Sequence, residues 1–528
     1  MTVLVKRRGA GATSGAEAEP GAPGTHQQPV LVASLRMEAH ALRGAARWAE
    51  VMRCGMGEDR ARAFAERGVL DGGRPLVIAG FCGALDPDLL PGDLVLATEL
   101  RADGRRVVCD DATILAGHLR RGGLRVHVGP IHTSDTLVRG SAERERLHAS
   151  GAIAVDMESV WLVPQRRSAP VVVLRAVVDT ASRELHRPLR TTAGAAAAYR
   201  SLARAAQLME EWAASLGARQ LVMASPRASC AGVQRAVEIV ERVLQQRGGP
   251  VYVRRQIVHN AHVVESLARR GAVFVKELDE VPEGATVIFS AHGVSPQVRA
   301  QAQSRSLEVI DATCPLVAKV HAEARRFAQA GYSIVLIGHE DHEEVVGTVG
   351  EAPERIQVIA DAEAVATLAV DDDQRVAHLS QTTLAVDETD AVIEALRARF
   401  PAVASPPSAD ICFATQNRQD AVRAVAADAD LVVVVGSANS SNSCRLVEVA
   451  QRAGGRAILV EDAEQLRPAD LRGVRRIGLS AGASVPEVWV QAVVTAISGL
   501  GELRVGERSV ATESVHFKLP PELGTGEQ

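Results

Sequence analysis

The feature that most constrains the fold is the alternation of short apolar runs with amphipathic helical stretches along almost the whole chain. In the first part, runs rich in Val, Ile and Leu predict strands at 30–35, 75–80, 93–100, 124–129, 152–157 and 171–179. A long amphipathic stretch over about 192–216 predicts the helix that closes this part. Strands that alternate with helices form a mainly parallel or mixed sheet, so the sequence predicts an α/β fold.

A second α/β series follows a short linker, predicted at Gly217–Arg219. Its strands are expected at 220–225, 249–253, 285–290, 332–338, 430–436 and 457–461, and its main helices at 236–246, 321–330 and 391–400. We therefore expect a disordered extension (1–28), a first domain that folds by itself (29–218), a second domain (219–520) and a tail (521–528). The second domain divides at its cysteines into three similar units, at about 221–314, 315–410 and 411–497.

Composition limits the class of protein. The 528 residues are 47% hydrophobic with a net charge of −5, which is typical of a soluble globular chain of several domain-sized units. There is no basic excess to suggest a nucleic-acid partner. No apolar run approaches about 18 residues, so an integral membrane protein is not expected. Seven cysteines without a signal-like segment indicate a reducing, cytoplasmic location.

Three cysteines stand in turn-like segments far apart in the sequence. Cys230, Cys314 and Cys412 are separated by 84 and 98 residues and lie in PRASCAGV, DATCPLV and DICFATQNRQ. The first two follow predicted strands, where α/β sheets collect ligands. The spacing excludes a zinc knuckle and a CxxC redox pair. Two interpretations remain: three buried structural cysteines, or three thiolates around one iron–sulfur cluster with an open fourth position.

Further motifs lie in order between these cysteines. They read PRASCAGVQRAVEIVE, QIVHN, IFSAHGVS, DATCPLVAKVH, GHEDHEEVVGT, SQTTLAVDET, DICFATQNRQDAV, GSANSSNSCRL and SAGASVPE. With these segments, residues 221–520 resemble the 4-hydroxy-3-methylbut-2-enyl diphosphate reductases. The resemblance implies three α/β units in a pseudo-threefold arrangement around a [4Fe-4S] cluster on the three cysteines. It also implies a ferredoxin- or flavodoxin-type electron donor and formation of isopentenyl and dimethylallyl diphosphate.

The resemblance also implies roles for single residues. Glu344 matches the family's proton donor, although on its own it would be a surface glutamate in an acidic stretch. The matches to the family's substrate-binding residues are His259, His292, His342, Thr382, Ser440, Ser441, Asn442 and Ser484. Imidazoles, hydroxyls and amides suit a diphosphate because they donate hydrogen bonds without removing iron from a cluster.

The chain departs from the family pattern near several of these residues. Ala228 and Ser229 stand where a glycine and an aromatic residue are usual, and Gln256, Ala318 and Glu343 replace Glu, Thr and Pro. Ala228 would be strained if its position requires a positive φ. Gln256 removes a charge beside His259. None of the departures removes a cysteine or Glu344.

The first half has motifs of another kind. VASLRMEAHAL, CGMGEDRA, IAGFCGALDPDLLPGDLVLATEL, HTSDTLV, VDMESV and VLRAVVDTA resemble the nucleoside phosphorylase and nucleosidase superfamily, especially methylthioadenosine/S-adenosylhomocysteine nucleosidases and hopanoid-associated phosphorylases. The resemblance implies that Asp179 protonates the leaving purine, Glu158 holds the ribose hydroxyls and Glu38 positions water. Gly83 is expected in a glycine turn at the ligand.

Together the two resemblances predict a bifunctional fusion. The first half would cleave the N-glycosidic bond of an adenosine derivative such as adenosylhopane, with water or phosphate as nucleophile. Two alternatives stay open for it: a salvage nucleosidase for methylthioadenosine or S-adenosylhomocysteine, and a non-catalytic module that binds a purine or dimerises the reductase. A homo-oligomer formed through this half is a further option, and the sequence leaves the oligomeric state open.

Overall fold

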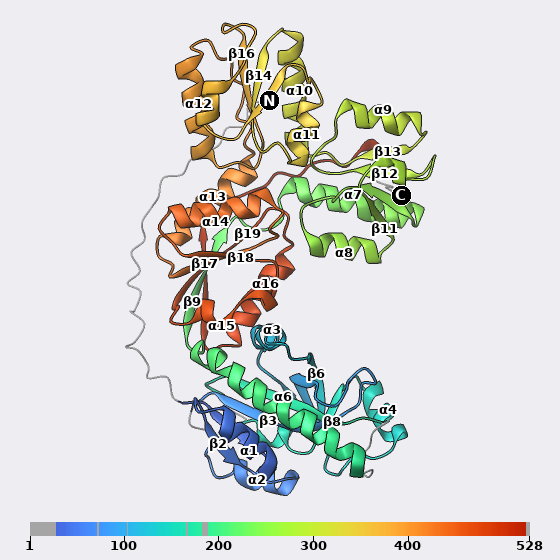
Figure 1. The fold of residues 1–528 in the computed structure, drawn as a ribbon, viewed down its shortest axis with the longest axis vertical. Helices are drawn as coiled ribbons and strands as arrows, with labels where there is room; N and C mark the ends of the chain where they lie inside the picture. The colour runs from blue at the N-terminus through green and yellow to red at the C-terminus, as the bar shows by residue number, and fades with distance from the viewer. Residues whose placement is uncertain (1–27, 71–72, 103, 165–166, 182–187, 524–528) are drawn as a thin grey trace.

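The protein consists of two α/β halves stacked end to end (Figure 1). The computed structural model describes residues 28–70, 73–102, 104–164, 167–181 and 188–523. Apart from Gln28, the expected disordered extension lies outside the described residues. The first half occupies one end of the molecule, and the second half forms three lobes around a common centre (Figure 1).

The first half is built on one eight-stranded mixed sheet in the order β2-β1-β3-β7-β6-β4-β5, with β8 paired to both β3 and β4. The strands are β1 (Val30–Ala33), β2 (Glu50–Arg53), β3 (Leu76–Ala84), β4 (Leu94–Ala102), β5 (Arg105–Val108), β6 (Val126–Thr133), β7 (Ala154–Asp156) and β8 (Val171–Asp179). Because β8 joins β3 to β4, the pairings β3-β8-β4-β6-β7 close into a ring, as in a barrel. All six strands expected from the sequence are present, and β2 and β5 are additional.

Among the described residues of this half, six helices surround the sheet: α1 (Arg36–Ala45), α2 (Glu58–Ala65), α3 (Thr113–Arg121), α4 (Ser141–Ala149), α5 (Ser159–Leu162) and α6 (Pro188–Ala214). The expected closing helix is α6, which runs along the half toward the second half (Figure 1). Its apolar side buries Leu202, Met209 and Trp212 against the sheet core.

The second half contains three parallel sheets, one in each lobe. The first has the order β11-β10-β12-β13, the second β15-β14-β16 and the third β18-β17-β19-β9-β20. The strands are β9 (Arg219–Ser225), β10 (Val251–Arg254), β11 (Ala272–Val275), β12 (Thr286–Phe289), β13 (Glu308–Asp311), β14 (Ser333–Ile337), β15 (Ile356–Ile359), β16 (Val376–Ser380), β17 (Leu431–Val435), β18 (Ala457–Val460), β19 (Arg476–Ala481) and β20 (Leu503–Ser509).

Helices connect these strands and cover the sheets. They are α7 (Ala231–Arg247), α8 (Ala261–Arg269), α9 (Pro296–Ser304), α10 (Pro315–Gln329), α11 (Glu343–Val349), α12 (Val386–Arg399), α13 (Phe413–Ala426), α14 (Ser441–Arg452), α15 (Pro468–Leu471) and α16 (Glu487–Ser498). Short 3₁₀ segments are η1 (Leu278–Glu280), η2 (Glu363–Thr367), η3 (Ala463–Gln465) and η4 (Pro521–Leu523). The strands and helices expected from the sequence in this half are all present.

The three lobes do not contain the same strands as the three units expected from division of the sequence at the cysteines. β9 was expected to open the first unit, but it pairs with β19 and β20 in the third sheet. β20 lies beyond residue 497, where the third unit was expected to end. The third sheet therefore contains strands from both ends of the second half. Pairing of β9 with β20 joins the first residues of this half to its last strand.

Two smaller expectations are also wrong. Arg219 was assigned to the linker, but it is the first residue of β9 and pairs with Leu503. The tail was expected to begin at residue 521, yet Pro521–Leu523 forms η4, and Leu523 is buried in the core of the first lobe. The apolar side chain of Leu523 explains this, because its burial outweighs the entropy of ordering the chain end.

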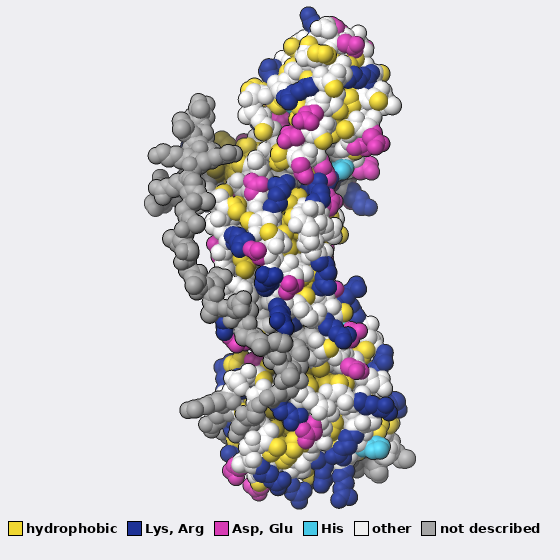
Figure 2. Space-filling view, turned by 90° about the vertical axis from the view of Figure 1, so that its left-hand side faces the viewer, with side chains coloured by type: hydrophobic (Ala, Val, Ile, Leu, Met, Phe, Trp, Pro, Cys, Tyr) yellow, Lys and Arg dark blue, Asp and Glu magenta, His cyan; other side chains and the backbone are white. Residues whose placement is uncertain are grey.

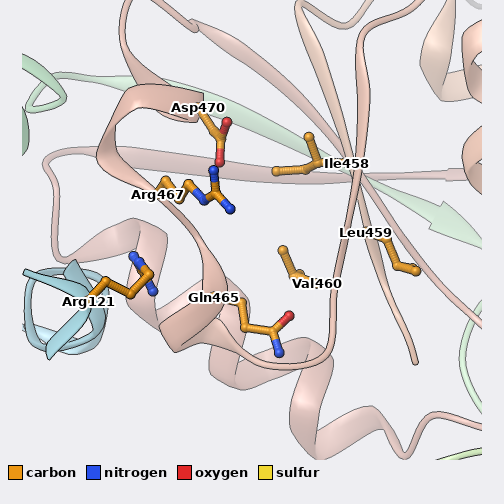
Figure 3. A pocket seen from close by; sticks show the side chains of 7 residues that line it. All are labelled: Arg121, Ile458, Leu459, Val460, Gln465, Arg467 and Asp470. Atoms are coloured by element: carbon orange, nitrogen blue, oxygen red, sulfur yellow. The ribbon is translucent and has the colours of Figure 1, made fainter. Parts of the chain in front are cut away.

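The two halves share a hydrophobic core. Leu119 of α3 and Trp212 of α6 belong to the same buried cluster as Leu466, Leu471 and Ile497 of the third lobe. At this seam Arg120 forms an ion pair with Glu464. A hollow of about 430 Å³ opens beside it, with Arg121 on the α3 side (Figure 3). Separation of the halves would expose this shared core, and independent folding of the first half stays a prediction.

The surface shown in Figure 2 carries basic, acidic and apolar side chains interspersed over both halves. Within the described residues, no helix combines the length with the apolar character that a membrane crossing needs.

Candidate active sites

The three cysteines singled out in the sequence stand at the starts of three helices in the second half. Cys230, Cys314 and Cys412 are the N-caps of α7, α10 and α13. A Cβ atom added to Gly232 would lie 2.7 Å from Sγ of Cys314 and 3.9 Å from Sγ of Cys230. These two sulfurs therefore lie against the same glycine. Electrostatic contacts of Cys314 and Cys412 with Cys230 place the third thiol in the same group.

This arrangement fits an iron–sulfur cluster better than a single metal ion. Burial, together with the neighbouring Cys230 and Cys412, raises the pKa of the Cys314 thiol to about 12. Burial raises the pKa of the Cys412 thiol to about 11. Among the described residues, no three His, Cys, Asp or Glu side chains are placed to hold one metal ion. A four-iron cluster differs because each thiolate binds a different iron, so the three sulfurs need not converge on one point.

Backbone hydrogen bonds connect the cysteine loops to the other residues singled out. The Cys314 N–H donates to the Ala291 carbonyl, next to His292, at 3.0 Å. The Cys412 N–H donates to the Thr382 carbonyl at 3.1 Å. Thr382 in turn holds Glu344: its N–H donates to Oε1 at 2.7 Å and its hydroxyl to Oε2 at 3.0 Å. Thr382 thus connects a cysteine loop to the expected proton donor.

Glu344 is not a surface glutamate. It lies in the first turn of α11, is 2% exposed, and burial raises its pKa. A carboxyl with a raised pKa retains its proton to higher pH, as a general acid requires.

The three histidines come together from two lobes. The rings of His259 and His292 stack with centroids 4.1 Å apart, and His342 contacts both edge-on at 5.5 and 5.9 Å. Burial, and then the neighbouring His292, lower the pKa of His259 to about 3 and that of His342 to about 4. Both imidazoles are therefore neutral near pH 7 and can donate one hydrogen bond each.

Hydroxyls and an amide from the third lobe adjoin this cluster. Ser440 is the N-cap of α14 and accepts a hydrogen bond from the Ser443 N–H. Ser484 donates to the carbonyl of His259 at 3.0 Å. Asn442 is 5% exposed, and neither polar atom of its side chain has a hydrogen-bond partner among the described residues. A buried amide without partners is costly, which indicates that a polar ligand completes its hydrogen bonds.

Two neighbours of this group were missed in the sequence. Gln381 is 1% exposed; its amide donates to Thr383 at 2.8 Å, and the hydroxyl of Thr383 lies 3.1 Å from that of Ser441. The pair joins the loop of Thr382 to the start of α14. Their position beside Thr382, in SQTT, was the available signal.

The first half brings its expected residues from α1, the start of α5 and the end of β8 toward strands β3 and β8. Glu38, near the start of α1, is 2% exposed; its carboxylate accepts hydrogen bonds from the N–H groups of Ser34, Leu35 and Phe81 at 2.7–2.9 Å. A Cβ on Gly80 would collide with both Glu38 and the fully buried Arg175. Gly80 on β3 is paired in register with Arg175 on β8, so glycine at this position leaves room for both side chains.

Glu158 and Asp179 lie in the same region. Glu158 accepts the Gly57 N–H at 2.9 Å, lies 3.8 Å from Arg175, and burial raises its pKa. Asp179 forms a buried ion pair with Arg144 at 2.5 Å. A Cβ on Gly83 would lie 2.9 Å from Oδ1 of Asp179. Gly83 was expected in a turn, but it lies within β3 at a break in the β3–β8 register.

Sequence reasoning missed both arginines of this site. Arg175 had a signal, because a charge in the middle of a buried apolar strand demands partners, here Asp156 at 2.8 Å. Arg144 had none, since α4 is a polar surface-type helix in sequence.

A family model described as LytB protein matches residues 221–498, more than half of the chain. The chain belongs to the LytB protein family. A second model, the phosphorylase superfamily, matches residues 49–214. Both resemblances expected from the motifs, and the α/β fold with a phosphorylase-like first half, are thereby confirmed.

Relatives of known name cover the second half almost completely. The 4-hydroxy-3-methylbut-2-enyl diphosphate reductase of Nocardia farcinica is 56% identical over 309 residues, 58% of this chain and 92% of that protein. A reductase of the same name, numbered 2, from Mycobacterium tuberculosis H37Rv is 57% identical over 306 residues, 58% and 91% of the two chains. The solved E-1-hydroxy-2-methyl-but-2-enyl-4-diphosphate reductase of Plasmodium falciparum has a TM-score of 0.56 at 36% identity, covering 58% of this chain and 97% of that one. The expectation of an enzyme of this reductase family is confirmed.

The residues that depart from the LytB pattern lie in different surroundings. Ala228 has a φ of 58°, so the positive φ that would strain it is present. Gln256 contacts Nδ1 of His259 at 3.3 Å and accepts from Asn439 at 2.9 Å, so it replaces the missing charge with neutral hydrogen bonds. Ser229 donates to the Val485 carbonyl at 2.9 Å. Ala318 is exposed on α10, and its backbone N–H donates to the carbonyl of Cys314 at 2.9 Å.

Glu343 is the departure with an electrostatic effect. Its carboxylate lies 3.3 Å from Nδ1 of His292. Burial would raise the pKa of Glu343, but the contact with His292 outweighs it and holds the pKa below its usual range. A fixed negative charge therefore lies beside a histidine of the cluster, where it opposes an incoming anion.

Proposed function

We propose that the second half reduces (E)-4-hydroxy-3-methylbut-2-enyl diphosphate to isopentenyl and dimethylallyl diphosphate. Two electrons and two protons remove the hydroxyl as water. The observation that carries the proposal is the buried Glu344 carboxyl, held by Thr382, whose carbonyl accepts from Cys412. Family membership and the reductase relatives support it.

The side chains divide the work. His259, His292, His342, Ser440, Ser441, Asn442 and Ser484 would hold the diphosphate through neutral or singly charged donors. Glu344 would donate a proton to the departing hydroxyl, and Thr382 would orient the Glu344 carboxyl. Cys230, Cys314 and Cys412 would hold a [4Fe-4S] cluster. When bound, such a cluster supplies electrons, received from a ferredoxin- or flavodoxin-type donor, and an iron open to an oxygen ligand.

Turnover of the anaerobically reconstituted full chain tests this proposal. Glu344→Gln keeps the shape of the side chain and removes the proton, so it should lower kcat by about 10²–10⁴-fold while iron content stays unchanged. Glu340→Gln, at an exposed position of the same acidic stretch, is the matched control and should retain activity. Near-normal turnover by Glu344→Gln would show that the proton comes from another group.

For the first half, we propose cleavage of the N-glycosidic bond of an adenosine derivative with a hydrophobic 5′ substituent, such as adenosylhopane. The match to the phosphorylase superfamily supports it, together with three buried carboxylates grouped at β3 and β8. Glu38 would position the nucleophile, Glu158 the ribose hydroxyls, and Asp179 would protonate the purine. Such an activity beside an isoprenoid-forming half would serve one class of lipid.

The buried Arg144–Asp179 pair favours a second candidate, a non-catalytic module that binds a purine or dimerises the reductase. A guanidinium at 2.5 Å favours the ionised carboxylate, whereas proton donation needs the protonated one. Adenine release by the full chain separates the two, with methylthioadenosine, S-adenosylhomocysteine and an adenosylated hydrophobic chain, each with and without phosphate. Asp179→Asn should cut release by about 10²–10⁴-fold, and the exposed Asp88→Asn should not. No release from any substrate would select the module.

A further inference from the structure

Each helix that begins at one of the three cysteines carries a cation in its second turn. Arg235 on α7 stands five residues after Cys230, Lys319 on α10 five after Cys314, and Arg418 on α13 six after Cys412. In Figure 1 the three helices lie in three different lobes. None of these cations has a role in the proposed reaction.

Arg418 is the most buried of the three, at 1% exposed. Its guanidinium donates to the Ala228 carbonyl at 2.7 and 3.0 Å. Ala228 precedes Cys230 by two residues and has the unfavourable φ of 58°. Glu513, from the C-terminal segment, balances the charge at 3.0 Å. A cation on the Cys412 helix therefore holds the strained loop of Cys230.

Lys319, on the helix of Cys314, makes the corresponding contact with the loop of Cys412. Its ammonium donates to the carbonyls of Ser408 and Ala409 at 2.7 and 2.8 Å. It also pairs with the buried Asp410 at 3.2 Å. These three residues lie two to four positions before Cys412, so a cation on the Cys314 helix holds the loop of Cys412.

Arg235 makes the third contact. It donates to the carbonyl of Thr313, the residue before Cys314, at 3.1 Å. A second donor of the same guanidinium binds the Lys518 carbonyl at 2.8 Å. A cation on the Cys230 helix thus holds the loop of Cys314, and the three contacts close a head-to-tail circle.

We propose that Arg235, Lys319 and Arg418, the cation ring, are positioning residues that fix the three cysteine loops relative to one another before the cluster is bound. Each cation hydrogen-bonds backbone carbonyls of the next cysteine's loop, so no loop depends only on its own lobe. The three lobes are separate sheets, and without such bonds their relative motion would change the spacing of the sulfurs. The inference rests on the proposed cluster for its purpose and on the observed bonds for its geometry.

Hydrogen exchange in the iron-free full chain tests the ring independently of cluster and activity. Met keeps much of the length of these side chains and removes the donors. Lys319→Met should speed amide exchange about tenfold or more at 408–412, Arg418→Met at 226–230, and Arg235→Met at 311–314. The loosened loop is in each case the loop of the next cysteine. Changes confined to the mutated helix, or spread evenly, would overturn the proposal.

Loss of iron to a chelator gives a second measurement, in the reconstituted chain. Each Met variant should release iron faster, by about 10–100-fold for the buried Arg418 and less for Arg235. Arg418→Lys, which keeps a cationic donor, should restore much of the retention even if Arg418→Met folds poorly. Controls on the same helices are Arg242→Met and Arg326→Met, whose ion-pair partners lie on their own helix, and Arg423→Met, whose partners are Asp420 on its own helix and Asp387 on α12. Release rates equal to those of the controls would refute the ring. Failure of the wild-type chain to bind iron would refute the proposed cofactor, and hydrogen exchange would still decide the ring.

Discussion

Burial decides the protonation states of both candidate sites at the scale of single residues. Burial raises the pKa of the carboxyls of Glu344 and Glu158, and it lowers the pKa of His259 and His342. Desolvation disfavours the charged form in every case, so acids keep protons and imidazoles lose them. In the second half, burial therefore favours the protonated form of Glu344 and leaves His259 and His342 as neutral hydrogen-bond donors near neutral pH.

The same effect makes the second half sensitive to acid. Burial lowers the pKa of His378, on β16, to about 4 from 6.5. As pH falls below about 6.5, His378 binds a proton in the unfolded chain but not yet in the folded chain, and this lowers the free energy of unfolding. The stability associated with this histidine is therefore fully present above pH 6.5 and is lost by about pH 4. The loss amounts to about 3 kcal/mol. Tm measured from pH 7 to pH 4 should fall less steeply in His378→Gln than in the wild type. Identical slopes would contradict the shift.

At the scale of elements, the cysteine centre is made from helix starts. Each thiol is an N-cap, where the helix N-terminus favours a negative charge. This offsets part of the burial cost when the thiols become thiolate ligands. The first turn of α7 also needs Gly232, because two sulfurs lie against it.

Gly232→Ala should therefore disturb the cluster more than the fold. Its Cβ would lie 2.7 Å from Sγ of Cys314, so that sulfur must move. We expect iron content after reconstitution to fall by more than half, with Tm changed by only a few degrees. Gly506→Ala, where nothing lies within 4 Å of the added Cβ, is the control and should keep its iron. Full iron content in Gly232→Ala would mean that the sulfurs are placed differently.

The sequence predicted the buried strands well, because burial requires runs of apolar residues. It predicted the edge strands and the sheet membership of β9 poorly, because these depend on which strands pair with each other. The six strands expected in the first half are apolar runs, whereas the missed β2 and β5 form the two edges of the sheet and carry Glu50, Arg53, Arg105 and Arg106. Edge strands carry such charges without loss. β9 looked like the first strand of a new unit, and only long-range pairing shows that it belongs to the third sheet.

The same distinction holds for the sites. Motif resemblance named the cysteines, the histidines and Glu344, and the structure brings them together. The motif resemblance gave no sign of Arg144 or of the cation ring, because these side chains bind carbonyls or carboxylates that are distant in sequence.

At the scale of the whole molecule, the halves are joined by packing as well as by the chain. Gly117 on α3 lies so close to the Glu464 carbonyl of η3 that a Cβ would collide with it. Gly499 has the same relation to the carbonyl of Asp111. With the shared core, these contacts predict that the halves unfold together.

Gly117→Ala should push the two halves apart where α3 packs against η3, because the added Cβ would collide with the Glu464 carbonyl. Calorimetry should show one transition for the wild type and two for the variant, the lower several degrees below the wild-type Tm, because the shared core opens first. Gly44→Ala, on α1 with open space around the added Cβ, should keep the single transition. Two transitions already present in the wild type would show that the seam does not couple the halves.

The most direct test of the three-cysteine centre is an iron count with electronic absorption on the anaerobically isolated full chain. The wild type should be brown and contain about four irons per chain. Cys230→Ser, Cys314→Ser and Cys412→Ser should each lose most of the iron and the colour, whereas Cys82→Ser and Cys444→Ser should keep both. A full cluster in the Cys314→Ser protein would contradict the assignment.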